Sequence, residues 1–257
     1  MLSISTQLAP EDDLPTFSAM LKSVNFADEI VIYAMGDTQA NIRSLISGNV
    51  RIIPVPTPKI VEEIRARQVR EAQGDWVLIM DYDEIIPPAL RAEILALTQP
   101  VKPTEKGAFA LRRRNFSLGY PLSHGGWGDD YVIRLFRKSA FRTWPTNIHS
   151  TPTFQGELGK LPHPMEHHKD ASLSQMVIKT NRYSAVEARQ FFEGGLPPVT
   201  VFTLLRKPIM EFCRRYFCKL GFFDGAIGLL QSLYQSYSVF LSYAKLYELQ
   251  HKHIDKK

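Results

Sequence analysis

The chain has 257 residues, of which 44% are hydrophobic and 22% are charged. This ordinary globular composition excludes a disordered or fibrous chain and allows one sizeable domain with an appendage. The net charge is +5, and the whole excess lies in residues 197–257, which hold nine Lys or Arg and four Asp or Glu. Residues 1–196 are balanced, with 22 of the 31 basic residues and 22 of the 26 acidic residues. A cationic field in this quarter of the chain would attract the phosphates of nucleic acid or of anionic lipid.

The N-terminus and the cysteines bear on the cellular compartment. Residues 1–5 have neither the basic segment nor the long apolar segment of a signal peptide, so we do not expect secretion. Cys213 and Cys218 are five residues apart on a predicted helix and face different sides. We therefore expect reduced thiols in a cytoplasmic protein.

Strand and helix patterns alternate along the first hundred residues. Strands are predicted at 28–33, 49–54 and 76–80, and helices at 38–46, 60–73 and 87–97. Gly74 is the predicted C-cap of the helix over 60–73. The strand over 76–80 is continuously apolar, as expected for a strand buried on both faces. This alternation predicts an α/β fold with a parallel sheet.

The second half of the chain is less regular. A strand begins at Phe109, and residues 119–168 are rich in Gly, Pro, His and Trp, so we expect functional loops there. Helices are predicted over 204–220 and after Asp224. We predict two domains, a catalytic domain over 1–195 and a helical extension over 196–257.

The last predicted helix has a narrow polar stripe, formed by Gln231, Gln235, Ser238 and Ser242. Residues 226–244 carry no charge, but six of these nineteen residues are Ser or Gln, which is too polar for a transmembrane span. The pattern suits an interfacial helix on an anionic membrane surface. The alternative is a helix packed on its neighbour or in a homodimer.

An acidic cluster, Asp81-Tyr82-Asp83-Glu84, directly follows the buried strand. Ligand sites of α/β proteins gather at the carboxyl ends of strands. Three adjacent carboxylates are electrostatically costly unless a cation is bound, and hard oxygen ligands suit Mg²⁺ or Mn²⁺ that bridges to substrate phosphates. The alternative is a solvated acidic turn before the next helix.

The segment 67–84 resembles the signature of family 2 glycosyltransferases: a helix ending in Ala-x-Gly-Asp, an apolar strand and an Asp-x-Asp motif. The resemblance implies a GT-A fold, an α/β nucleotide-sugar-binding domain with a mixed, mainly parallel sheet. It implies that Asp83 ligates the metal that holds the donor diphosphate. Asp81 would lie nearer the ribose and base and also contribute to the metal site, and Arg67 would contact the donor.

A second motif spans Gly125 to Arg137 and contains Gly-Trp-x-x-Asp-x-x-x-Arg-Leu-Phe. It resembles a segment of bacterial lipopolysaccharide-core glucosyltransferases. Inverting sugar transfer needs a base that takes the proton of the acceptor hydroxyl. By this match Asp130 is the base, Asp129 is its neighbour or substitute, and Trp127 lies at the donor. The alternative is an acidic turn before a strand.

Three further residues are weaker candidates by the same resemblance. His149 lies where the family places a histidine that helps to bind metal or diphosphate. Glu11 and Asp37 stand near the places of acidic residues that contact the nucleobase or ribose. Zinc binding by His163 and His167 is disfavoured, because no cysteine accompanies them and two prolines interrupt any helix there.

The predicted function is inverting, metal-dependent transfer of a sugar from a nucleotide-sugar donor, with a UDP-sugar favoured by the resemblance. The acceptor would be a saccharide or a lipid-linked saccharide of the cell envelope, reached from the cytoplasmic face of the plasma membrane. One alternative is a glycosyltransferase-like protein that binds nucleotide sugar without turnover. Another is a nucleic-acid-binding protein, but no nucleic-acid motif accompanies the basic tail.

Overall fold

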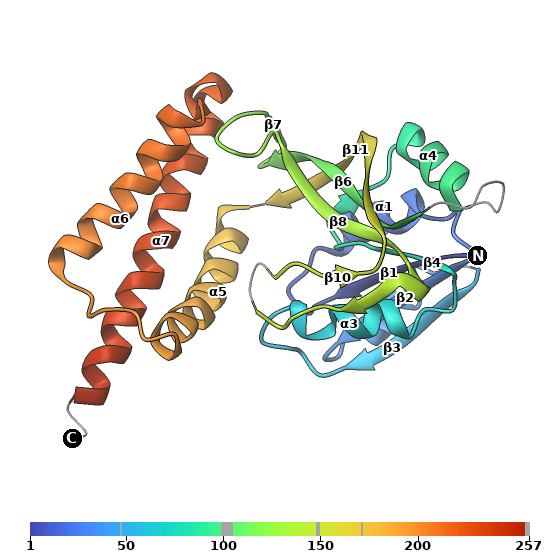
Figure 1. The fold of residues 1–257 in the computed structure, drawn as a ribbon, viewed down its shortest axis with the longest axis horizontal. Helices are drawn as coiled ribbons and strands as arrows, with labels where there is room; N and C mark the ends of the chain where they lie inside the picture. Colours follow the sequence, from blue (N-terminus) through green and yellow to red (C-terminus); the bar gives the residue numbers. More distant parts are fainter. Residues whose placement is uncertain (47, 99–104, 148–149, 171, 255–257) are drawn as a thin grey trace. The chain divides into compact units, whose positions relative to one another are not determined.

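The computed structural model describes residues 1–46, 48–98, 105–147, 150–170 and 172–254 (Figure 1). The chain divides into two compact units. The first consists of Met1–Arg114 and Asp130–His168, and the second of Asn115–Asp129 and Lys169–Lys257. Both units therefore take segments from two separate parts of the sequence.

The first unit is built on a mixed sheet, with the strand order β3-β2-β1-β4-β8-β6-β11-β5 among the described residues. Its parallel part has β1 between β2 and β4, with β3 beyond β2. Antiparallel pairing begins where β8 joins β4 and continues from β8 to β6. The strand bounds are β1 Leu2–Leu8, β2 Glu29–Met35, β3 Val50–Val55, β4 Trp76–Ile79, β5 Glu84–Ile85, β6 Lys106–Ser117, β8 Asp130–Arg137 and β11 Glu157–Asp170.

Helices cover both faces of the parallel strands. α1 (Leu14–Ser23) and α4 (Pro88–Thr98) share one apolar core with alternate residues of β1, β2 and β4, such as Ile4, Ile32 and Leu78. The opposite residues of β2 and β4 pack beneath α3 (Glu62–Arg70). This is the period-two division of side chains expected for strands buried on both faces. The predicted α/β class is confirmed.

Gly74 has a different role from the one predicted. The helix predicted over 60–73 is present as α3, but it ends at Arg70 with Glu71 as its C-cap, so the prediction of Gly74 as the C-cap was wrong. A Cβ at Gly74 would lie 2.7 Å from the backbone nitrogen of Ser3 and 2.8 Å from the carbonyl oxygen of Met1. Glycine is required here because the chain passes directly against the start of β1. The helix predicted over 38–46 is also shorter, as α2 spans Gln39–Ile42.

The prediction of loops throughout 119–168 was wrong as well. Two long strands, β8 and β11, cross this region, together with β7 (Tyr120–Leu122), β9 (Phe141–Thr143) and β10 (Thr153–Phe154). Pro162 and Pro164 lie within strand β11, which agrees with the prediction that they interrupt any helix. β11 pairs with β5 through Glu166 and His167, which lie opposite Ile85 and Glu84 and follow both prolines.

The second unit is helical. It contains α5 (Leu173–Glu193), α6 (Val201–Cys213), a π-helical turn (Arg214–Cys218), a 3₁₀ turn (Gly221–Asp224) and α7 (Gly225–Ile254). α7 packs against both α5 and α6. The two C-terminal helices were predicted, whereas α5 was not. Within the described residues, no helix has the length and apolarity needed to cross a membrane.

We expect Gly74→Ala to lower the free energy of unfolding by about 1–3 kcal/mol, the usual cost of forcing atoms into a packed site. Urea denaturation monitored by circular dichroism measures the change. The neighbouring Gln73→Ala is the matched control, because the Gln73 side chain is exposed and its backbone N–H still donates to Glu29. Equal free energies of unfolding for Gly74→Ala and Gln73→Ala would show that the packing of residue 74 against β1 does not require glycine.

Candidate active site

The polar residues of the candidate site lie at the carboxyl ends of the parallel strands. The loops after β1, β2 and β3 meet there, since a Cβ at Gly36 would lie 3.4 Å from both Pro10 and Thr57. β4 ends beside β1, where Met80 N donates to Ser5 O at 3.0 Å. Asp81 follows at once. The chain therefore delivers the acidic cluster to the edge at which α/β sheets bind ligands.

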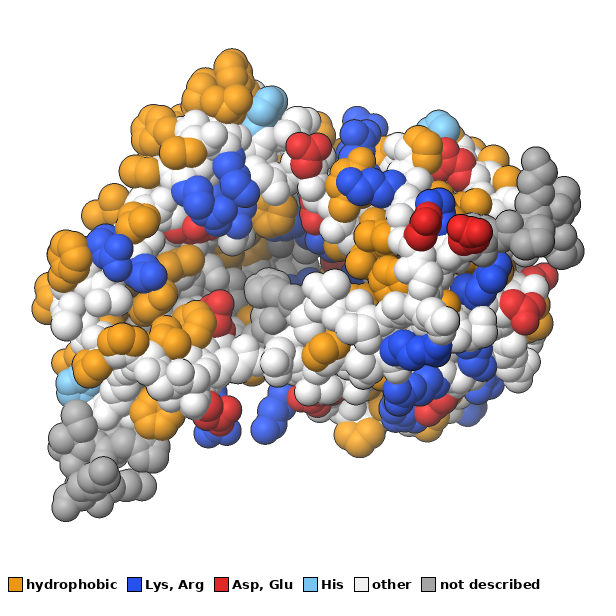
Figure 2. Space-filling model, viewed as in Figure 1, with side chains coloured by type: hydrophobic (Ala, Val, Ile, Leu, Met, Phe, Trp, Pro, Cys, Tyr) orange, Lys and Arg blue, Asp and Glu red, His pale blue; other side chains and the backbone are white. Residues whose placement is uncertain are grey.

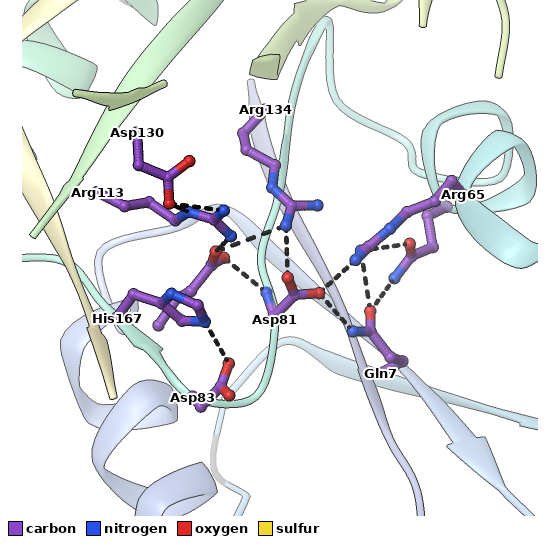
Figure 3. A network of polar contacts seen from close by, with 10 residues as sticks. Gln7, Arg65, Asp81, Asp83, Arg113, Asp130, Arg134 and His167 are labelled. Carbon is purple, nitrogen blue, oxygen red and sulfur yellow. Dashed lines mark hydrogen bonds and ion pairs between the residues drawn. The ribbon is translucent and has the colours of Figure 1, made fainter. Parts of the chain in front are cut away.

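Asp81 is held on both carboxylate oxygens. Oδ1 accepts a hydrogen bond from Gln7 Nε2 at 2.7 Å and pairs with Arg65, and Oδ2 pairs with Arg134 (Figure 3). Arg65 comes from α3 and Arg134 from β8, and both guanidinium groups are almost fully buried. Asp81 therefore joins a helix and two strands in one ionic contact.

The contact extends to the predicted base. Glu84 is fully buried and lies 3.5 Å from Arg134 and 3.7 Å from Arg113. Arg113 Nε donates to Asp130 Oδ2 at 2.8 Å. Three carboxylates and three arginines thus alternate from Arg65 to Asp130 (Figure 3), and we call this set the ionic chain: Arg65, Asp81, Arg134, Glu84, Arg113 and Asp130.

The pKa shifts follow from this arrangement. Burial alone would raise the pKa of the Asp81 carboxyl, but the charges of Arg134 and Arg65 outweigh it and hold this pKa well below its ordinary value. Burial raises the pKa of the Glu84 carboxyl, and the charge of Asp81 adds to the rise. Arg134 has a raised pKa, because the paired carboxylates outweigh its burial. Asp81 is accordingly the firmly ionised member of the acidic cluster.

The electrostatic argument for a cation needs correction. The sequence suggested that the acidic cluster is too costly without a bound metal ion. The structure instead provides Arg65, Arg134 and Arg113 as counter-charges. The burial of paired charges depends on such close partners. The cluster can therefore fold without a metal, and metal binding has to be judged on the ligands themselves.

Asp83 lies on the other side of the turn from the ionic chain. It is buried, and its Oδ1 is 3.6 Å from Nε2 of His167 on β11 (Figure 3). The backbone of His168 also donates to Asp83 O at 2.8 Å. A carboxylate and an imidazole thus lie together at the strand ends. Among the described residues, no group of three or more His, Cys, Asp or Glu forms a metal-binding set, and His149 lies outside those residues.

The predicted donor-side residues Glu11, Asp37 and Arg67 make contacts that are separate from the ionic chain. Glu11 and Asp37 are exposed, on the loops after β1 and β2. Arg67 pairs with Glu71 at 2.9 Å and lies over the ring of Tyr33 at 5.6 Å. Arg65, and not Arg67, is the α3 arginine that reaches Asp81.

Trp127 and Asp129 belong to the second unit, whereas Asp130 belongs to the first. Arg215 and Lys169 each lie over the Trp127 ring, at 5.0 and 4.1 Å. Asp129 is exposed. The predicted base and its predicted substitute are therefore neighbours in sequence that fold with different parts of the chain.

The predicted site set lacked four residues that hold it together, Gln7, Arg65, Arg113 and Arg134. Arg134 belongs to the Arg-Leu-Phe part of the second motif. Because side chains alternate between the two faces of a strand, the sequence of β8 could have placed Arg134 on the face of the acidic cluster. Arg113 is one of three consecutive arginines, and the sequence does not distinguish which of them turns inward. Gln7 belongs to no sequence motif that would mark it as a site residue.

Known proteins resemble the chain over nearly its whole length. An uncharacterized glycosyltransferase of Rickettsia typhi is 24% identical over 263 residues, covering 98% of this chain and 89% of the relative. The lipopolysaccharide core biosynthesis glycosyltransferase LpsC of Rhizobium meliloti is 24% identical over 185 residues, covering 70% and 66%. The chain is a homologue of glycosyltransferases. The predicted enzyme class is confirmed by these relatives.

No protein-family model matches this glycosyltransferase homologue. Among solved structures, the mannosyltransferase PcManGT of Pyrobaculum calidifontis, in complex with GDP-Man and Mn²⁺, aligns with a TM-score of 0.48 and 11% identity. The alignment covers 97% of this chain and 86% of that chain.

We expect Arg134→Met to destabilise the protein by about 3–5 kcal/mol, because it leaves the Asp81 and Glu84 carboxylates buried with one counter-charge fewer. Arg67→Met is the control, since its pair with Glu71 is exposed and worth at most about 1 kcal/mol. Urea denaturation of both variants at pH 7 measures the difference. Similar losses for the two would contradict the assigned role of the ionic chain.

Proposed function

We propose that this glycosyltransferase homologue is an inverting, metal-dependent enzyme that moves a sugar from a nucleotide-sugar, with UDP-sugar as the favoured donor. The acceptor is a saccharide or lipid-linked saccharide of the cell envelope. The observation that carries the proposal is the position of Asp81 and Asp83 beyond the carboxyl end of β4, with Asp81 linked through Arg134, Glu84 and Arg113 to Asp130.

The donor diphosphate and a metal belong at Asp83. Mg²⁺ and Mn²⁺ are commonly held by one or two protein groups together with substrate phosphates. Asp83 and His167 supply a carboxylate and an imidazole in one place, which fits such a site. Of the predicted ligands Asp81, Asp83 and His149, His149 lies outside the described residues. Bound there, the cation would offset the charge of the departing nucleoside diphosphate. Asp81, whose two oxygens are already paired, is assigned to positioning on the ribose side.

Asp130 acts as the base. It takes the proton of the acceptor hydroxyl while that oxygen forms a bond to the anomeric carbon. The bond from this carbon to the donor phosphate breaks, and the nucleoside diphosphate leaves with the electron pair. Attack from the face opposite the leaving group inverts the configuration. Arg113 holds the Asp130 carboxylate at 2.8 Å and fixes its direction.

The basic residues 197–257 and the name of one relative support the proposed acceptor and the proposed location at the membrane. LpsC is named for lipopolysaccharide core biosynthesis, which supports a cell-envelope acceptor. The basic excess of residues 197–257 supports work at the inner face of the plasma membrane, on an anionic surface. Nucleic acid is not the proposed partner, because Arg113 of the Arg112–Arg114 run is engaged with Asp130 and Glu84.

One observation favours the second candidate, a protein that binds nucleotide sugar without turnover. Asp130 is already paired with Arg113, so an acceptor hydroxyl has to share its carboxylate with that guanidinium group. Transfer and hydrolysis assays with a panel of nucleotide sugars, in Mn²⁺ and in Mg²⁺, separate the two candidates: turnover supports the enzyme, and binding alone supports the second.

Asp83→Ala should abolish the metal-dependent thermal stabilisation by the donor, because it removes the carboxylate proposed to hold the cation. Differential scanning fluorimetry with UDP-sugars, with and without Mn²⁺, measures this. Asp75→Ala is the matched control, an exposed carboxylate eight residues earlier that pairs with the N-terminus. Donor stabilisation that persists in Asp83→Ala would refute the metal assignment.

Asp130→Asn should reduce the rate of transfer on the order of 10²–10⁴-fold, the usual contribution of a general base. Donor binding should be retained, because the amide oxygen can still accept from Arg113. Asp129→Asn serves as the control and should retain most of the activity. Full activity of Asp130→Asn, or a loss confined to Asp129→Asn, would move the base to another residue.

A further inference from the structure

The polar side of α7 faces inward. Gln231 is 1% exposed, and its Nε2 donates to Ser117 Oγ at 2.5 Å. Ser242 Oγ donates to Glu187 at 2.5 Å. Two members of the predicted polar stripe, Gln231 and Ser242, therefore make hydrogen bonds inside the second unit.

The opposite side of α7 is apolar and exposed. Leu233, for example, is 53% exposed. The exposed apolar residues of this helix are Leu229, Leu233, Tyr237, Phe240 and Tyr247. Their spacings of four, four, three and seven residues place them on one face of the helix. A helix in water has the reverse arrangement, with its apolar face inward.

α6 also exposes apolar side chains. Val201 and Phe202, at its beginning, are 75% and 69% exposed, and Leu205, Ile209 and Met210 continue along the helix. The corner between α6 and α7 adds Phe217, Leu220, Phe222 and Phe223, which are exposed as well. Figure 2 shows hydrophobic side chains gathered along the α6 side, with Lys and Arg among them. An apolar surface that extends over two helices and their corner marks an interaction site.

The charges beside this surface are almost all positive. Residues 201–223 contain five Lys or Arg and one acidic residue, Glu211. Glu211 is paired with both Arg214 and Arg215 at 2.6 Å. Arg206 lies over the Phe202 ring at 5.5 Å, so its stem follows the apolar surface. Apolar residues flanked by Lys and Arg are the pattern of helices that lie in the interface of anionic membranes.

We propose that the hairpin of residues 201–247 is a monotopic membrane element that lies in the interface of a bilayer with anionic lipids. α6, at 13 residues, is about 20 Å long, which is shorter than the roughly 30 Å hydrocarbon core. A second copy of the chain fits this face less well. A two-fold interface would set the cationic residues of α6 against their own copies, and like charges oppose such pairing.

The corner of the hairpin also holds the Trp127 segment. Gly125 N donates to Lys219 O at 2.8 Å, and Arg215 Nη1 donates to Gly125 O at 2.9 Å. Arg215 lies over the Trp127 ring. Docking of the hairpin would therefore bring residues 125–127 to the bilayer surface. This consequence rests on the proposed function, in which the acceptor is lipid-linked; membrane docking itself does not.

The experiment is flotation of the full chain with vesicles of phosphatidylcholine alone and of phosphatidylcholine with 30% phosphatidylglycerol. Ile209→Glu is compared with Ile178→Glu on α5, because both isoleucines are 60% exposed. We expect wild type and Ile178→Glu to float with the anionic vesicles, and Ile209→Glu to lose at least tenfold in the bound fraction. Added salt should weaken binding.

The native thiols give a second readout. Cys213 and Cys218 are exposed and are the two cysteines of the chain, so an environment-sensitive fluorophore attached to them should shift to the blue when anionic vesicles are added. Equal flotation of the two glutamate variants, or an unshifted emission, would overturn the proposal. Concentration-dependent dimerisation abolished by Ile209→Glu, without flotation, would assign the face to a second copy. No sugar donor is needed, so failure here is distinct from failure of the transferase assignment.

Discussion

The pairing of Asp81 with Arg65 and Arg134 is the interaction on which the candidate site depends. Asp81 follows β4, the strand at which the sheet changes from parallel to antiparallel pairing, and its two guanidinium partners come from a helix and from the first antiparallel strand. The pairing therefore fixes α3, β4 and β8 at one point. It also keeps a carboxylate ionised in a buried place, which requires close counter-charges. Because Arg134 also reaches Glu84, and Glu84 reaches Arg113, this point is linked to Asp130.

The alternation of apolar runs was sufficient to predict β2, β3, β4, α3 and α4, since each is defined by periods within its own segment. It failed for β11, which lies in the Gly-, Pro-, His- and Trp-rich stretch predicted to form loops and which pairs with neighbouring strands that are distant in sequence. The acidic motif was singled out because it follows an apolar strand, and Asp130 was singled out by resemblance to a family segment. Their arginine partners were not singled out, because Arg65, Arg113 and Arg134 are far apart in the sequence and ion pairs leave no periodic pattern.

The helical unit illustrates the same limit in another form. The sequence of α7 gives two faces, one with Gln and Ser and one with Leu, Tyr and Phe. It does not say which face is buried, because either arrangement has the same period. The contacts of Gln231 with Ser117 and of Ser242 with Glu187 decide it. The catalytic chemistry proposed for the first unit and the membrane contact proposed for the second thus rest on different observations.

Residues 115–129 fold with partners that follow them by about a hundred positions. The backbone N–H groups of Ser123 and His124 donate to Asp224, and Arg215 and Lys219 hold Gly125. Chains emerge from the ribosome N-terminus first, so this segment is synthesised well before the residues that hold it. A nascent chain that has completed β1 to β4 still lacks the partners of Trp127. The segment next to Asp130 therefore gains these contacts only after residues 215–224 have been made, which delays maturation of this part of the molecule by about a hundred residues of synthesis.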